Sequence, residues 1–270
     1  MSSEIIGLTD WLTTPPGAYL LGWERLRFDE AVSDVFGYHA LQLGLPELDA
    51  LQANRMPHKW LALESAPAAQ TPDKVGAPAA TARRAALLTD SGALPFPESS
   101  LDLVVLPHTL ELSRDPHATL REVSRVLVPE GRVVISGFNP TSLWGLRQRR
   151  GHLYQRWGYD SFFLPKTGEF IGYWRLRDWL RLLDFEVESG RFGCYRPALA
   201  SQAWLDRFEW MDAAGERWWS IFGAVYFLAA VKRVRGVRLL EPAWKTRKAP
   251  AAAPAAVANK EPAVRLRPPG

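Results

Sequence analysis

Short, uninterrupted runs of apolar residues alternate along this chain with segments whose apolar residues recur every three or four positions. A strand covered on both faces of a sheet has such a continuous run, whereas a helix with one buried face shows the longer spacing. Strands alternating with helices favour an α/β fold, in which a parallel sheet carries helices on both faces. The expected strands are 38–43, 59–64, 85–89, 101–106, 132–136, 185–188 and 221–231.

Two helix starts combine a capping residue with a proline. Thr14 precedes Pro15, and Asp115 precedes Pro116. A side-chain oxygen at the cap accepts a hydrogen bond from the first turn, and proline suits the first helical position. The first helix should extend towards Phe36. Its apolar stripe is expected to comprise Tyr19, Leu20, Trp23 and Leu26.

Further helices are expected from their spacing and their flanking residues. One should open at Pro46. Another should have one apolar face that comprises Leu176, Trp179, Leu180 and Leu183. A third should cover 201–213. The segment Pro129-Glu130-Gly131 should turn the chain directly into the fifth strand.

Composition excludes several classes of protein. The chain has 47% hydrophobic and 23% charged residues, which is ordinary for a globular protein. The single cysteine, Cys194, excludes a disulfide framework. No two glycines are separated by one residue, and no G-K-[ST], G-x-S-x-G or H-x-x-x-H pattern occurs. These absences argue against the usual dinucleotide fingerprint, the P-loop, the hydrolase elbow and a helical zinc site. No metal site is expected.

Polar residues and one glycine follow the first four expected strands, where ligands bind in sheets of this kind. Gly44 would let a ligand approach the backbone, and Glu64 could accept hydrogen bonds from a ribose diol. Asp90 could meet an adenine edge, and His108 could orient a substrate or take a proton. Each also has a structural interpretation, as a plain turn, a solvated charge, a helix cap or a packing residue. The residues alone leave both interpretations open.

Charge and tryptophan are unevenly distributed. Residues 1–139 carry 11 Lys/Arg against 17 Asp/Glu, whereas residues 140–270 carry 22 against 12. Eight of the 12 tryptophans lie between Trp144 and Trp219. The basic half is either a solvated surface with a basic tail or a surface for an anionic partner such as a nucleic acid. The tryptophans could line an apolar pocket, or they could be core residues.

Two stretches carry a family resemblance. Residues 89–105, TDSGALPFPESSLDLVV, and residues 120–132, LREVSRVLVPEGR, occur in the order of two signatures. Together they resemble class I S-adenosylmethionine-dependent methyltransferases of the type 11 group, in a bacterial subgroup of unassigned substrate. The resemblance implies a Rossmann-like, seven-stranded, mostly parallel sheet whose last strand is antiparallel.

The resemblance also implies S-adenosylmethionine as cofactor and a methyl acceptor beside its methionine end. His108 would lie where cofactor and acceptor meet, and it is the candidate catalytic base. The first loop departs from the family, because Gln42, Pro46 and Leu48 stand where an acidic residue and glycines are usual. The implied cofactor-binding residues are Gln42, Gly44, Glu64, Asp90, Ser91 and Leu106.

The expected activity is therefore methyl transfer to an unidentified acceptor, most simply a small molecule. Two alternatives stay open: a degenerate fold that acts through partners, and a protein that binds or modifies nucleic acid through its basic half. The N-terminus lacks the pattern of a signal peptide and no apolar run is long enough to span a bilayer, so a cytoplasmic protein is expected.

Domain organisation follows from the same patterns. We expect an N-terminal helical extension over 1–36, a methyltransferase domain over 37–240 and a disordered Ala/Pro-rich tail over 241–270. Within the domain, residues 139–172 form a long connection rich in aromatic and basic residues. Long connections are often functional, so this one is expected to act as a lid over the site.

Overall fold

The computed structural model describes residues 7–64, 85–155, 163–164 and 170–233. These residues contain a seven-stranded sheet with the order β3-β2-β1-β4-β5-β7-β6. Strand β7 pairs antiparallel with both β5 and β6, while the other pairings are parallel. The expected fold class is thereby confirmed. The strands are β1 (His39–Leu43), β2 (His58–Leu63), β3 (Leu87–Leu88), β4 (Leu101–Pro107), β5 (Leu127–Phe138), β6 (Phe185–Gly193) and β7 (Val225–Lys232).

The order of the strands creates a switch point between β1 and β4. The chain runs outward from β1 through β2 to β3, then returns to place β4 on the other side of β1. The register pairs Leu41 of β1 with Val104 of β4, both fully buried. In open α/β sheets ligands bind beyond the carboxyl ends of the strands at such a point. The loops after β1 and β4 are therefore the first place to look for a site.

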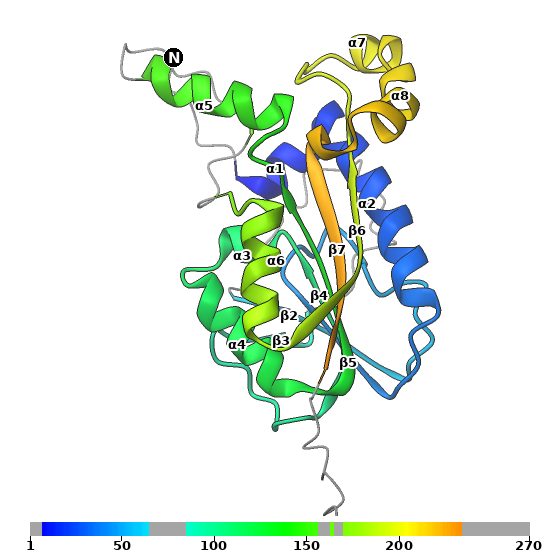
Figure 1. Cartoon of the computed structure of the whole chain (residues 1–270), viewed down its shortest axis with the longest axis vertical. Coiled ribbons are helices and arrows are strands. Elements are labelled where there is room, and N and C mark those ends of the chain that lie inside the picture. Colours follow the sequence, from blue (N-terminus) through cyan, green and yellow to red (C-terminus); the bar gives the residue numbers. More distant parts are fainter. Residues whose placement is uncertain (1–6, 65–84, 156–162, 165–169, 234–270) are drawn as a thin grey trace, which may run out of the picture. The chain divides into compact units, whose positions relative to one another are not determined.

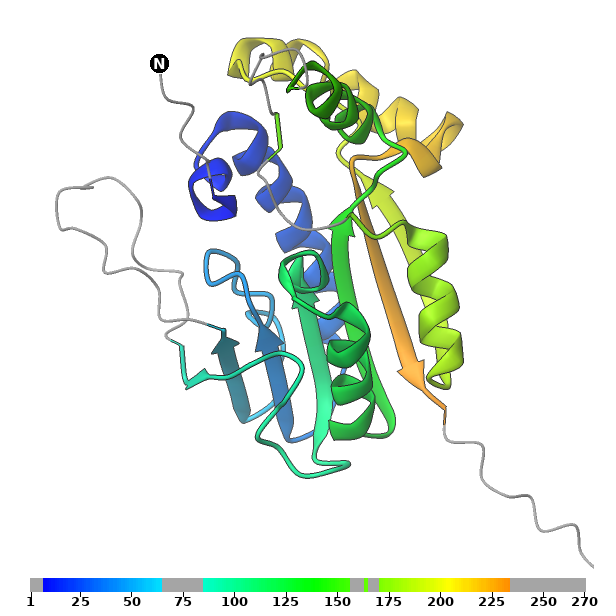
Figure 2. The same cartoon turned by 90° about the vertical axis from the view of Figure 1, so that its left-hand side faces the viewer.

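Helices cover both faces of this sheet (Figure 1 and Figure 2). One face carries α3 (Thr109–Leu112), α4 (Pro116–Val126) and α6 (Tyr173–Leu182), and the other carries α1 (Leu8–Leu12) and α2 (Pro15–Ser33). Beyond the carboxyl ends of the parallel strands, at the top of Figure 2, lie α5 (Leu143–Gln155), α7 (Gln202–Arg207) and α8 (Trp210–Trp218). A short 3-10 helix, η1 (Ser220–Phe222), precedes β7.

Helix α2 starts as expected but buries a different stripe. The Thr14 side chain accepts a hydrogen bond from the Gly17 amide at the N-terminus of the helix. The predicted stripe was wrong in part, because Leu26 is 61% exposed. The side chains that face the sheet recur every four residues instead, and one of them is charged. This stripe comprises Leu20, Glu24, Phe28 and Val32.

Three other local predictions need correction. No helix opens at Pro46, because the loop after β1 folds around the Gln42 side chain instead. The helix expected over 201–213 is divided into α7 and α8. Strand β5 begins five residues early, at Leu127, and the predicted turn lies inside it as an irregularity where Glu130 adopts a φ of 65°.

Several expectations concern residues outside those described. The tail over 241–270 lies wholly outside them, as do Trp157, Tyr159 and Phe162 of the 139–172 connection. Within the described residues, no helix combines the length and the hydropathy that crossing a membrane would require.

Candidate functional site

The loops that follow β1 and β4 touch at the switch point. Gly44 has a φ of +74°, which glycine adopts without strain, and its amide donates to the Ala62 carbonyl of β2 over 2.9 Å. A Cβ at this position would lie 3.3 Å from Thr109 Oγ1. The Thr109 hydroxyl in turn donates to the Leu43 carbonyl at the end of β1. Glycine is therefore required here both for the backbone conformation and for the close approach of the two loops.

Gln42 shapes the loop after β1 from inside. Its side chain is fully buried, and Nε2 donates to the carbonyls of Gly44, Leu45 and Leu48 over 3.2, 3.0 and 2.6 Å. Its Oε1 accepts from the Ala50 amide over 3.0 Å. A carboxylate could not donate these hydrogen bonds. In place of the acidic residue and the glycines that the family usually has here, this chain therefore has a loop that is closed around a buried glutamine.

Glu64 and Ser91 meet at the next two strand ends. The Ser91 hydroxyl donates to Glu64 Oε1 over 2.6 Å, and it lies 3.1 Å from the Thr119 hydroxyl of α4. Ser91 is buried, while Glu64 is exposed to solvent. The serine thus orients a carboxylate that is open to a ligand at the carboxyl end of β2.

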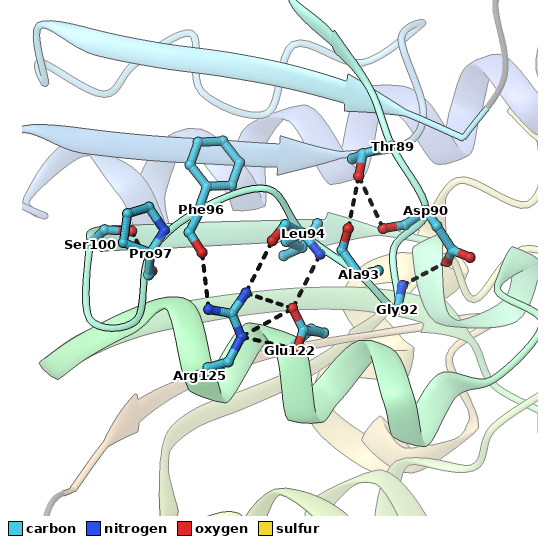
Figure 3. Close-up of polar contacts among 10 residues, drawn as sticks. All are labelled: Thr89, Asp90, Gly92, Ala93, Leu94, Phe96, Pro97, Ser100, Glu122 and Arg125. Atoms are coloured by element: carbon cyan, nitrogen blue, oxygen red, sulfur yellow. Dashed lines mark hydrogen bonds and ion pairs between the residues drawn. The ribbon is translucent and has the colours of Figure 1, made fainter.

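Asp90 closes its own turn after β3. Its Oδ1 accepts from the Gly92 amide over 2.8 Å, and the neighbouring Thr89 hydroxyl donates to the Ala93 carbonyl over 3.0 Å (Figure 3). The Asp90 side chain remains exposed. Leu106, in contrast, is fully buried in the core under α3, α4 and α6. If Leu106 meets a cofactor, its backbone makes that contact.

A charged pair on α4 holds the loop that carries Asp90 and Ser91. Arg125 donates to the carbonyls of Phe96 and Leu94, each over 3.0 Å, and forms an ion pair of 2.8 Å with Glu122 (Figure 3). Glu122 also accepts from the Leu94 amide over 3.1 Å. The two stretches of the family signature are therefore bound to each other, which gives a structural reason for their occurrence together.

His108 lies directly after β4 between two carboxylates. It has a φ of 51° and precedes the first residue of α3. Its Nδ1 lies 2.9 Å from Glu111 Oε2, and its Nε2 lies 3.1 Å from Glu24 Oε1 of α2. The imidazole also packs on the ring of Phe138, with centroids 4.4 Å apart. All three titratable side chains are fully or almost fully buried. We call Glu24, His108 and Glu111 the buried triad.

The carboxylates decide the charge of this histidine. Burial alone would lower the pKa of His108, but the charge of Glu24 and the hydrogen bond to Glu111 outweigh it and raise that pKa to about 10. Burial also raises the pKa of Glu111, against the opposing effect of His108. His108 is therefore an imidazolium at neutral pH, without a lone pair to accept a proton. This favours a positioning role over that of a catalytic base.

Glu24 and Glu111 are the residues that sequence reasoning did not single out. Both oxygens of Glu111 are hydrogen-bonded, one to His108 and one to the Phe138 amide. Neither oxygen of Glu24 has a hydrogen-bond partner within the described structure, although Oε1 lies 3.1 Å from His108 Nε2. A sequence signal did exist, because Glu24 lies four residues from both Leu20 and Phe28 on one helix face.

The 139–172 connection is described only in part. Trp144 of α5 is fully buried, and its Nε1 donates to the Arg196 carbonyl over 2.7 Å. Its ring packs against Trp11 of α1 and against Phe163, at centroid distances of 5.9 and 5.4 Å. This tryptophan is a core residue. Among the residues described, no group of three His, Cys, Asp or Glu side chains is arranged to hold a metal ion.

Comparison with known proteins places this geometry in context. Residues 62–135, from β2 into β5, match a family model described as a methyltransferase domain. The uncharacterized protein YafS of Escherichia coli K12 is 45% identical over 100 residues, 37% of this chain and 39% of that protein. The malonyl-[acyl-carrier protein] O-methyltransferase of Halorhodospira halophila is 41% identical over 58 residues, 22% of this chain and 20% of that protein. The chain thus spans about two fifths and one fifth of the lengths of these relatives.

A solved structure extends the comparison to the fold. A chain from the Haloferax volcanii complex between the Trm112 methyltransferase activator and a methyltransferase aligns with 86% of this chain and 99% of its own length. The TM-score is 0.52, and the sequence identity is 17%. At this identity the similarity concerns the fold alone.

Proposed function

We propose that the protein transfers a methyl group from S-adenosylmethionine to a small-molecule acceptor. The proposal starts from the class I methyltransferase domain of the type 11 group, which the family match and the fold identify in this chain. One observation carries the proposal. The loops after β1 and β4 meet at the switch point, and at the neighbouring end of β2 the carboxylate of Glu64 is exposed and oriented by Ser91.

The residues at this edge fit the cofactor that the family implies. Glu64 offers two carboxylate oxygens to a ribose diol, and Ser91 holds it from behind. Asp90 and the backbone of its turn are available to an adenine edge. Gly44 carries no side chain and adopts the positive φ that the turn after β1 requires. The side chain of Gln42 is not available to the cofactor, because its amide is hydrogen-bonded within the loop after β1.

When bound, the cofactor supplies a methyl group that is already activated by the positive charge on sulfur. The work left to the protein is alignment of the acceptor with that methyl group and exclusion of water. His108 lies buried at the end of β4, between its two carboxylates and against the ring of Phe138. We assign it a positioning role in this reaction.

Isothermal titration of the purified protein with S-adenosylmethionine and S-adenosylhomocysteine tests the proposal directly. We expect saturable binding of both with one site per chain. Gly44→Ala should reduce the affinity at least tenfold, since the new Cβ is strained at this φ and approaches Thr109. Gly22→Ala is a matched control, because a Cβ at Gly22 meets no atom within 4 Å. Absence of binding by the wild type would overturn the proposal.

The closed loop around Gln42 favours one alternative, a fold that no longer binds the cofactor and acts through partners. The same titration separates the two, because that protein would bind neither compound. A nucleic-acid function receives less support from the described residues. Arg175, Arg177 and Arg207 lie over tryptophan rings, and Arg196 is paired with Asp212. Steeply salt-dependent binding to RNA or DNA would nevertheless support it.

A further inference from the structure

Glu24 is an unusual residue for its position in α2. The helix packs against the sheet through side chains that recur every four residues, and the neighbours of Glu24 in that stripe, Leu20 and Phe28, are fully buried. Glu24 itself is also fully buried. A leucine would fill this place without desolvating a charge. Burying a carboxylate is costly unless it is paired and hydrogen-bonded, so its presence calls for a partner.

The described structure provides that partner only in part. His108 is within ion-pair distance, yet both Glu24 oxygens and His108 Nε2 lack a hydrogen bond. Glu111 already neutralises the imidazolium and is itself bonded through both oxygens. Two carboxylates therefore share one imidazolium, and the oxygens of Glu24 are the ones left without a hydrogen bond.

The buried triad lies beside the loops that would hold the cofactor. His108 is followed by Thr109, which contacts the end of β1 and faces Gly44. Ser136 lies in β5 opposite the end of β4, where its carbonyl accepts from the His108 amide, and its hydroxyl also lacks a partner. Buried oxygens without a hydrogen-bond partner therefore lie at the edge of the sheet where the cofactor would bind.

We propose that Glu24 provides the negative charge that selects the cationic sulfonium of the methyl donor over its neutral thioether product. This rests on the proposed function and deepens it. Because Gln42 stands where the family usually has an acidic residue, the loop after β1 has no carboxylate at that position. Glu24, which belongs to α2, supplies a carboxylate in its place. In a poorly solvated site a unit charge acts over several ångströms, so the carboxylate need not touch the sulfur. His108 and Glu111 hold Glu24 in place.

The test compares ligands that differ in charge at one position. S-adenosylmethionine carries a sulfonium there, sinefungin an amine that is protonated at neutral pH, and S-adenosylhomocysteine a neutral sulfur. Glu24→Gln keeps the shape of the side chain and removes its charge. We expect it to weaken binding of the two cationic ligands by about 10- to 30-fold and that of S-adenosylhomocysteine by less than about threefold. Titration calorimetry measures all three affinities.

Two further variants separate recognition from structure. Glu30→Gln removes a carboxylate from the same helix at a site that is 57% exposed, and it should change none of the affinities. His108→Gln removes the positive charge of the triad, so it should widen the preference for the cationic ligands. A residue that only supports the fold would move all three affinities together. If Glu24→Gln does not fold, the affinities of His108→Gln for the three ligands test the proposal.

The outcomes distinguish the two proposals. If the wild type binds none of the three ligands, the methyltransferase function itself is wrong. If the wild type binds all three and Glu24→Gln weakens them equally, the function stands and Glu24 is only a structural residue.

Discussion

At the scale of single residues, the candidate site is defined by which polar groups remain available after the fold is made. Gln42 looks like a ligand-binding residue in the sequence, but its amide is committed to three carbonyls of its own loop. Glu64 keeps an exposed carboxylate, oriented by the Ser91 hydroxyl over 2.6 Å. Both side chains could bind a ligand by their chemical type. Only Glu64 remains available to do so, because the amide of Gln42 is already hydrogen-bonded within its own loop.

Glu64→Ala should weaken S-adenosylhomocysteine binding by roughly 10- to 100-fold, because charge-assisted hydrogen bonds are worth about 1.5–3 kcal/mol. The melting temperature should change little, since the exposed carboxylate makes few packing contacts. Glu64→Gln should be intermediate, as it keeps one acceptor oxygen. Wild-type affinity in the alanine variant would show that the ribose lies elsewhere.

The buried triad predicts how stability depends on pH. The pKa of His108 is raised from 6.5 in the unfolded chain to about 10 in the fold, so its contribution is complete below 6.5 and is lost as pH rises towards 10. The raised pKa of Glu111 acts in the same direction. The free energy of unfolding should therefore fall between about pH 6.5 and 8.5, before free cysteine and tyrosine titrate, with at most about 1.4 kcal/mol per pH unit from the histidine.

Urea denaturation at several pH values measures this slope. His117→Gln removes an exposed histidine from α4 and should leave the decline unchanged. Stability that stays level or increases over this interval would mean that His108 is neutral in the fold.

At the scale of elements, the loop after β3 depends on α4 for its shape. Strand β3 contains only Leu87 and Leu88, too short to position the following residues alone. Arg125 and Glu122 position the loop instead, through hydrogen bonds to the backbone of Leu94 and Phe96 (Figure 3). The N-terminus of α4 is itself set by Asp115, whose side chain accepts from the amides of His117 and Ala118.

Arg125→Ala should therefore cost about 1–2 kcal/mol, because several charge-assisted bonds are lost at a partly exposed site. For a chain of this size that corresponds to a fall of about 2–8 °C in the melting temperature. Arg121→Ala, an exposed position on the same helix, should be close to neutral. Equal effects of the two substitutions would argue against a role of Arg125 in holding the loop after β3. Differential scanning calorimetry of both variants gives the comparison.

At the scale of the whole described molecule, aromatic contacts join the N-terminal helices to segments distant in the sequence. Trp11 packs on Phe138 and Trp144, each at 5.9 Å, and donates to the Phe163 carbonyl over 2.7 Å. Phe28 of α2 packs on Phe227 of β7 at 5.0 Å. The N-terminal extension thus contributes to the same core as the sheet, besides supplying Glu24.

Truncation from the two ends should consequently have opposite results. Removal of residues 1–36 should abolish the cooperative unfolding transition, because it exposes the apolar face that α1 and α2 cover. Removal of the residues after Lys248 should leave the melting temperature unchanged, since that sequence is Ala/Pro-rich without a periodic apolar stripe. Circular dichroism melts of the two truncated proteins check both. A drop of several degrees after C-terminal truncation would show that the tail docks.

Much of the fold and part of the candidate site were set by the sequence alone. Continuous apolar runs, the caps at Thr14 and Asp115 and the two signature stretches are local features, and local backbone and side-chain preferences are sufficient to determine them. The buried triad was decided only by the tertiary structure. Glu24 meets His108 because α2 packs against the sheet beside the end of β4, and helix periodicity does not encode that long-range contact. The hydrogen bonds of Gln42 are local in sequence, but they form only when the loop closes around the buried amide, and the residue types of the loop do not encode that closure.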